Sequence, residues 1–179
     1  MNKAVFLDRD GTINQEVNYL YRPKNLVFIP KTIEAIKLFH QLGYKVIVIT
    51  NQAGVAKGYY KEHHIRILHN YIDKMLKENG TYLDAYYYCP HHPEGTVDIY
   101  KKECMCRKPR IGMIERAVMD FDIDLSKSII VGDKEIDVKT GKNAVISTCV
   151  LVRSGQILDE DNTVADGVYD CLYDFATSM

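Results

Sequence analysis

Short apolar runs alternate along the chain with longer segments in which apolar residues recur every three or four positions. The runs at 3–7, 45–49, 85–88, 128–131 and 148–152 are rich in β-branched and aromatic residues and predict strands. The segments at 30–42, 62–78, 111–121, 138–143 and 172–176 predict helices. Regular alternation of strands and helices is typical of a mostly parallel sheet covered on both faces. We therefore expect a Rossmann-like α/β three-layer sandwich.

Proline and glycine set the ends of the first two predicted helices. Pro30 suits a first helical turn, and Gly43 and Gly80 follow the last residues with a helical period. Residues 13–28 lack any such period and predict a long loop, and residues 159–162 predict a polar surface loop.

Length and composition favour one ordinary globular domain over residues 1–179. Of its residues, 46% are hydrophobic and 26% are charged, and the formal net charge is −1. The balance of charge shows no basic surface for nucleic acid, and no apolar stretch reaches the length of a membrane span. The first residues do not resemble an export signal, so we expect a cytoplasmic protein that does not bind nucleic acid or membranes.

Three of the predicted strands end in polar residues. Asp8 and Asp10 follow the first strand, Thr50 follows the second, and Asp133 follows the fourth. Because the carboxyl ends of parallel strands share one edge of a sheet, we expect these side chains to converge there. Two carboxylates as close as Asp8 and Asp10 repel each other unless a bound cation, a nearby Lys or Arg, or protonation offsets the repulsion. The competing interpretation is a set of solvated strand ends.

Two loops at this edge offer further polar groups. Glu16, Asn18 and Tyr19 lie in the long first loop and could hydrogen-bond a polyol. A solvent-exposed connecting loop without a binding role is equally compatible with this sequence. The segment Thr50-Asn51-Gln52-Ala53-Gly54 could cradle a phosphate with a hydroxyl and backbone N–H groups, although an ordinary turn also fits.

Cysteine and histidine cluster in residues 89–106. Cys89 and His91 are followed by Cys104 and Cys106, with His92 as the rival to His91. Four nitrogen and sulfur ligands suit a closed tetrahedral zinc site, which favours a structural metal over chance clustering of free thiols. Such a site would order a loop that has little apolar content of its own.

A basic turn, Arg107-Lys108-Pro109-Arg110, follows the cluster directly. Arg and Lys are the common protein partners of phosphate, so this turn either faces a phosphate or is simply solvated. In contrast, His63, His64 and His69 lie on or near the predicted helix at 62–78, and we interpret them as surface or partly packed residues.

The motifs together resemble a known superfamily. D-R-D-G-T at residue 8, T-N-Q at residue 50, the lysine at 108 and G-D-x-x-x-D at residue 132 look like the haloacid dehalogenase superfamily of phosphatases. The segment C-P-H-H-P…C-x-C-R-K-P is similar to that of the D-glycero-D-manno-heptose 1,7-bisphosphate phosphatases and the related histidinol-phosphate phosphatase domains. The likeness extends from residue 3 to about residue 152, with no insertion large enough for a separate cap domain.

The resemblance implies a role for each motif residue. It makes Asp8 the nucleophile, Asp10 the acid and base, and Thr50 and Lys108 the partners of the transferring phosphoryl group. It assigns Mg²⁺ to Asp8, Asp133 and the backbone carbonyl of Asp10, and structural Zn²⁺ to Cys89, His91, Cys104 and Cys106. It implies that Glu16, Asn18, Tyr19, Asn51, Gln52, Ala53, Arg107 and Lys134 bind the substrate.

The main hypothesis is therefore a Mg²⁺-dependent phosphatase that removes the C7 phosphate of a heptose 1,7-bisphosphate through an aspartyl-phosphate. Histidinol phosphate or another small phosphomonoester is the alternative substrate, and a non-catalytic zinc-bearing interaction module is the alternative class. The sequence leaves open the anomer at C1, the downstream pathway and the role of Asp137, and we take a monomer as the default.

Overall fold

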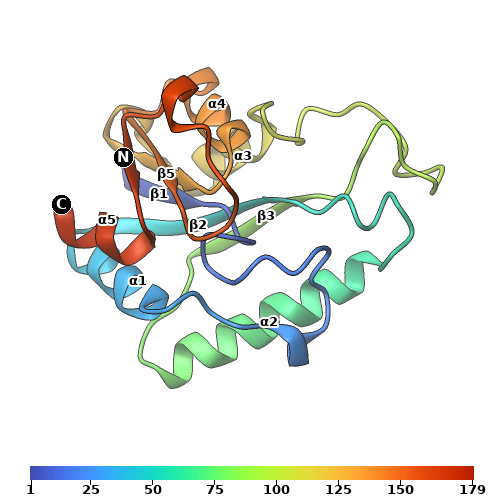
Figure 1. The fold of residues 1–179 in the computed structure, drawn as a ribbon, viewed down its shortest axis with the longest axis horizontal. Coiled ribbons are helices and arrows are strands. Elements are labelled where there is room, and N and C mark those ends of the chain that lie inside the picture. Colours follow the sequence, from blue (N-terminus) through green and yellow to red (C-terminus); the bar gives the residue numbers. More distant parts are fainter.

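A parallel six-stranded sheet forms the middle layer of the protein (Figure 1). The computed structural model describes all residues from 1 to 179. The strands are β1 (Lys3–Leu7), β2 (Tyr44–Asn51), β3 (Ala85–Cys89), β4 (Ile129–Gly132), β5 (Thr148–Val152) and β6 (Gly167–Tyr169). They lie in the order β3-β2-β1-β4-β5-β6, and every neighbouring pair is parallel. The expected parallel α/β architecture is confirmed.

Alternate residues of the central strands supply two separate apolar cores. In β1, Val5 and Leu7 face one core, while Ala4 and Phe6 face the other. These side chains are completely buried, which explains why the strand reads as a continuous apolar run in the sequence.

Helices cover both faces of the sheet (Figure 1). The first core packs against α1 (Thr32–Gln41), α2 (Glu62–Glu78) and α5 (Leu172–Ser178). The second core packs against α3 (Gly112–Phe121) and α4 (Glu135–Asn143). None of the helices is both long enough and apolar enough to cross a membrane.

Several element boundaries differ from the prediction. Helix α1 begins at Thr32, because Lys31 has a left-handed backbone (φ 63°) and leaves Pro30 outside the helix. Helix α4 begins at Glu135, three residues before the predicted start, where Asp137 accepts a hydrogen bond from the backbone N–H of Lys134. Strand β6 was not predicted, because three half-buried residues give too short a pattern.

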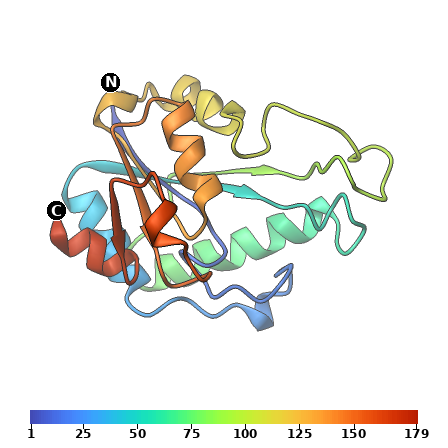
Figure 2. The ribbon, with the colours of Figure 1, turned by 45° about the horizontal axis from the view of Figure 1, so that its top comes forward.

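Three loops extend together beyond the carboxyl ends of the strands (Figure 2). They are the first loop, which contains a short 3-10 turn at Pro23–Asn25, the loop after β2, and the long loop between β3 and α3. The backbone N–H groups of Thr96 and Val97 donate to the carbonyl of Ala56, which ties the last two loops to each other. These loops form the walls of the site described next.

Candidate active site

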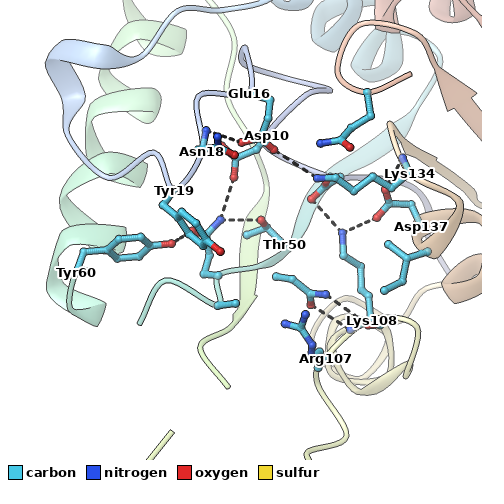
Figure 3. A pocket seen from close by; sticks show the side chains of 16 residues that line it. Asp10, Glu16, Asn18, Tyr19, Thr50, Tyr60, Arg107, Lys108, Lys134 and Asp137 are labelled. Carbon is cyan, nitrogen blue, oxygen red and sulfur yellow. Dashed lines mark hydrogen bonds and ion pairs between the residues drawn. The ribbon is translucent and has the colours of Figure 1, made fainter. Parts of the chain in front are cut away.

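The site lies at the topological switch point of the sheet, where the strand order changes direction. Strand β1 has β2 on one side and β4 on the other, and ligands of open α/β sheets bind beyond the carboxyl ends of strands at such a point. A cavity of about 320 Å³ opens there (Figure 3). Every predicted catalytic and substrate-binding residue lines it: Asp8, Asp10, Glu16, Asn18, Tyr19, Thr50, Asn51, Gln52, Ala53, Arg107, Lys108 and Lys134.

A buried ion triad occupies the floor of the cavity (Figure 3). The Lys108 ammonium donates to Asp8 Oδ1 at 3.0 Å, to Asp137 Oδ1 at 2.5 Å and to the carbonyl of Ile49 at 3.1 Å. Burial would lower the pKa of Lys108, but the two carboxylates raise it above its ordinary value. Burial would raise the pKa of Asp8, but Lys108 and Lys134 keep it below its ordinary value. The lysine is therefore a fixed cation beside an ionised Asp8.

Asp133 is held beside this triad without any hydrogen-bond partner. Its side chain is completely buried, and neither carboxylate oxygen has a partner. Burial and the charge of Asp8 raise the pKa of Asp133 to about 8. Gly11, with φ at +86°, and Gly155 permit this placement, since a Cβ on either would lie within 2.3 Å of Asp133 Oδ2.

These carboxylates fit a divalent cation. Ligand oxygens of Asp8, Asp133 and Asp137 lie within 4.8 Å of one another, and hard oxygen ligands are those that Mg²⁺ prefers. The two unpartnered oxygens of Asp133 are the groups that such an ion would satisfy. Both Asp137 oxygens accept hydrogen bonds, from Lys108 and from the Lys134 backbone N–H. Asp8 uses only Oδ1 and Asp133 uses neither oxygen, so these two residues are the ligands with free capacity.

Asp10 lines the cavity two residues beyond Asp8, and several donors hold its carboxylate. Oδ1 accepts from Asn14 Nδ2 at 3.0 Å, and Oδ2 accepts from Gln52 Nε2 at 3.1 Å. The Gln52 amide also donates to Thr50 Oγ1, and its oxygen accepts from the Tyr60 hydroxyl. The predicted proton-transferring group and phosphate-binding hydroxyl are thus part of one network.

The outer wall comes from the first loop and from α4. Lys134 Nζ lies 3.4 Å from Glu16 Oε2 and 3.8 Å from Asp133 Oδ1, so it joins the cavity rim to the carboxylate cluster. The Tyr19 hydroxyl accepts a hydrogen bond from Lys57 at 2.7 Å, and its ring packs edge-on against Tyr59. These contacts connect the first loop to the loop after β2.

A second cluster, of cysteine and histidine, lies at the end of β3 and in the loop between β3 and α3. Ligand atoms of Cys89, His91, Cys104 and Cys106 lie within 4.8 Å of one another, whereas His92 turns away and accepts from the backbone of Glu94. A hydrogen bond from Cys89 and the neighbouring His91 lower the pKa of Cys106 to about 5, which favours the thiolate form that metals bind. Three sulfur ligands and one nitrogen ligand fit a closed tetrahedral zinc site.

The cluster is joined directly to the basic turn. The side chain of Asn51 accepts from the backbone N–H of Lys108 at 3.0 Å and donates to its carbonyl at 3.4 Å. Arg107 donates to the carbonyl of His91 and lines the cavity, and it has no acidic partner. In contrast, Arg110 pairs with Glu103 on the outside, so only two of the three cations of the turn face the cavity.

The sequence analysis assigned no role to four of the lining residues, namely Tyr60, Ile136, Asp137 and Gln156. The G-D-x-x-x-D spacing did point to Asp137, but not to its pairing with Lys108. The interpretation of His69 as a surface or partly packed residue was wrong, because it is buried and its Nε2 lies 3.3 Å from Arg9.

Comparison with known proteins gives consistent results. The family model described as polynucleotide kinase 3 phosphatase matches residues 3–149. A D-glycero-alpha-D-manno-heptose-1,7-bisphosphate 7-phosphatase of Photorhabdus laumondii is 45% identical over 88% of this chain and 86% of its own. A D-glycero-beta-D-manno-heptose-1,7-bisphosphate 7-phosphatase of Haemophilus influenzae is 43% identical over 97% of this chain and 95% of its own.

A solved structure is also similar over the full length. The D,D-heptose 1,7-bisphosphate phosphatase of B. bronchiseptica, complexed with magnesium and phosphate, is 28% identical. It superposes with a TM-score of 0.86 and covers 98% of this chain and 97% of that chain.

Proposed function

The chain belongs to the polynucleotide kinase 3 phosphatase family and to the heptose-1,7-bisphosphate 7-phosphatases within the haloacid dehalogenase superfamily, and from this membership we propose that it is a Mg²⁺-dependent phosphatase. Its substrate is a D-glycero-D-manno-heptose 1,7-bisphosphate, and the phosphate removed is the one at C7. The observation that carries the proposal is the convergence of Asp8, Asp10 and Lys108 at one cavity of the size of a small ligand, with Asp133 buried beside Asp8. The alternative of a non-catalytic zinc module does not explain why these four groups converge.

The proposed reaction has two steps. Asp8 Oδ attacks phosphorus while the bond to the sugar oxygen breaks, and Asp10 gives that oxygen a proton. Asp10 then takes a proton from water as the water attacks the aspartyl-phosphate, which releases orthophosphate and restores Asp8. Lys108 neutralises Asp8 and the incoming phosphoryl oxygens, and the hydroxyl of Thr50 donates to one of them. Asp8, Asp133 and the Asp10 carbonyl would hold Mg²⁺, whose charge would offset the repulsion between the phosphoryl group and the carboxylates.

The remaining lining residues are proposed to recognise the sugar and its second phosphate. Arg107 has no carboxylate partner, so its guanidinium is available for the phosphate at C1. Glu16, Asn18 and Tyr19 offer polar groups to the sugar hydroxyls, and Lys134 is held by Glu16 beside the reacting end. Asn51, Gln52 and Ala53 complete the wall, with Asn51 also holding the backbone of Lys108.

Zinc is proposed to be structural. Cys89, His91, Cys104 and Cys106 would fill all four positions, which leaves none for substrate. The metal would fix the loop that aims Arg107 and Lys108 into the cavity. Thiol ligands of this kind suit a reducing compartment, which is consistent with a cytoplasmic enzyme.

We propose that the chain is one domain, since a single sheet carries the lining residues, and that it acts as a monomer on a small sugar phosphate rather than on nucleic acid. Phosphate release should be measured with both anomers of the heptose bisphosphate, histidinol phosphate and a 3′-phosphorylated DNA oligonucleotide. The proposal expects the highest kcat/KM for a heptose bisphosphate, with a 1-phosphate as the product seen by phosphorus NMR. Equal or better turnover of histidinol phosphate or DNA would refute the substrate assignment.

Arg107→Gln provides a matched test of substrate binding. It should raise KM for the bisphosphate by about tenfold and leave KM for a monophosphate nearly unchanged. An equal change for both substrates would place Arg107 outside the proposed C1 phosphate site.

A further inference from the structure

The largest fully buried side chain of the protein is Arg9, a residue to which the proposed mechanism gives no role. It lies between the two aspartates of the D-R-D-G-T motif and is only 1% exposed. A buried guanidinium requires compensating partners, since an unpaired buried charge is strongly destabilising. The partners of Arg9 therefore indicate what its burial achieves.

Most of the Arg9 donors point at Asp10. Nε donates to Asp10 Oδ1 at 3.3 Å, and one terminal nitrogen reaches Oδ1 at 3.1 Å and Oδ2 at 2.9 Å. The same nitrogen donates to the carbonyl of Leu20 in the first loop. Asp10 is 15% exposed at the cavity, so Arg9 holds its carboxylate from the buried side. A planar fork fixes the orientation of a carboxylate as well as its position.

The other terminal nitrogen of Arg9 contacts His69 Nε2 at 3.3 Å. Since arginine only donates, Nε2 must be the acceptor, and His69 must be the neutral tautomer that carries its proton on Nδ1. The imidazole stacks on Tyr86 with ring centroids 4.1 Å apart, and Tyr88 packs against its edge. Helix α2 and strand β3 thus hold the His69 imidazole in place, and His69 in turn positions the Arg9 guanidinium.

We propose that Arg9, supported by His69, is a positioning residue that sets the orientation of the Asp10 carboxylate for proton transfer. This inference rests on the proposed function in assigning proton transfer to Asp10. Loss of the fork should slow the steps in which Asp10 transfers a proton. It should not slow the attack of Asp8 on an ester whose leaving oxygen needs no proton.

Three variants separate this role from a general packing role. Arg9→Lys keeps a cation but removes the fork, and His69→Leu removes the acceptor, whereas His69→Gln retains an acceptor. An alkyl phosphate needs a proton on its leaving oxygen, and p-nitrophenyl phosphate does not. Thermal unfolding and bound zinc are measured on every variant to exclude misfolding.

For the alkyl ester, Arg9→Lys and His69→Leu should lose about 10- to 100-fold in kcat/KM. With p-nitrophenyl phosphate the same variants should release a rapid burst of p-nitrophenolate, because the aspartyl-phosphate forms at a near-normal rate and is hydrolysed slowly. His69→Gln should keep the wild-type ratio of the two esters. Equal losses for both esters without a burst, or no loss at all, would overturn the inference.

A crystal structure of His69→Leu gives a readout that does not depend on turnover. The Asp10 carboxylate should leave its single orientation against Arg9, and an unchanged orientation would count against the inference. A wild-type protein that hydrolyses neither ester nor the heptose bisphosphate would instead refute the proposed function, while the orientation of Asp10 would still decide the positioning role.

Discussion

The buried imidazole of His69 should make the stability of the fold fall between pH 7 and pH 5. His69 is 6% exposed and faces Arg9 at the end of β1 and the rings of Tyr86 and Tyr88 on β3. Burial, together with the Arg9 cation, lowers the pKa of His69 to about 3. An unfolded histidine has a pKa of about 6.5. The unfolded state therefore binds a proton that the folded state does not, and stability is lost as the pH falls below about 6.5.

The size of the effect follows from these two values. Protonation stabilises an unfolded histidine by about 2 kcal/mol at pH 5 and by only about 0.2 kcal/mol at pH 7. Folded His69 gains almost nothing over this range. The wild type should therefore lose about 2 kcal/mol more unfolding free energy from pH 7 to pH 5 than His69→Gln, which cannot take up the proton.

Urea unfolding followed by far-UV circular dichroism suits this protein, because the chain contains no tryptophan. Both proteins carry the cysteine cluster and all other histidines, so their contributions cancel in the comparison. His63→Gln, an exposed change on the same helix, is the matched control and should follow the wild type closely. Parallel loss of stability in the wild type and His69→Gln would refute a neutral, buried His69.

Three further predictions concern the proposed chemistry and metals. Asp8→Asn should reduce phosphate release by more than about 10³-fold and leave the circular dichroism spectrum unchanged, and full turnover would exclude an aspartyl-phosphate. Asp133→Asn should raise the melting temperature in EDTA, because Asn removes the cost of protonating the carboxyl or burying its charge beside Asp8. It should also reduce the further rise on adding Mg²⁺, and an unchanged response to Mg²⁺ in calorimetry would argue against a ligand role. Removal of zinc by a strong chelator should lower the melting temperature and kcat together, and so should Cys104→Ser. The chelated enzyme should recover when zinc is added but not when magnesium is added. Purified protein that contains no zinc would contradict this prediction.

Within the fold, the parts with strong local patterns could be predicted from sequence. The predicted bounds of β1, β5 and α2 agree with the structure, because each has a continuous apolar run or a complete helical period. The start of helix α1 was predicted two residues too early, and strand β6 was not predicted. The left-handed backbone of Lys31 and the pairing of β6 with β5 depend on contacts that leave little trace in local sequence.

The sequence by itself determined which chemical groups the protein presents and at which strand ends. Parallel strands bring their carboxyl ends to one edge, so Asp8, Thr50 and Asp133 had to meet once the strands paired. The spacing of Cys89, His91, Cys104 and Cys106 likewise indicated one cluster, since two short ligand pairs need only a loop to bring them together.

Only the tertiary structure decided how these groups are paired. The Lys108 ammonium could have faced any carboxylate of the site, and packing directed it to Asp8 and Asp137 while leaving Asp133 without a hydrogen bond. Arg9 and His69 are 60 residues apart and share no motif, so nothing local indicated that α2 supports the acidic motif at the end of β1. Pairing inside a low-dielectric core depends on distances of a few ångströms between elements, and those distances are fixed only when the whole sheet and its helices have packed.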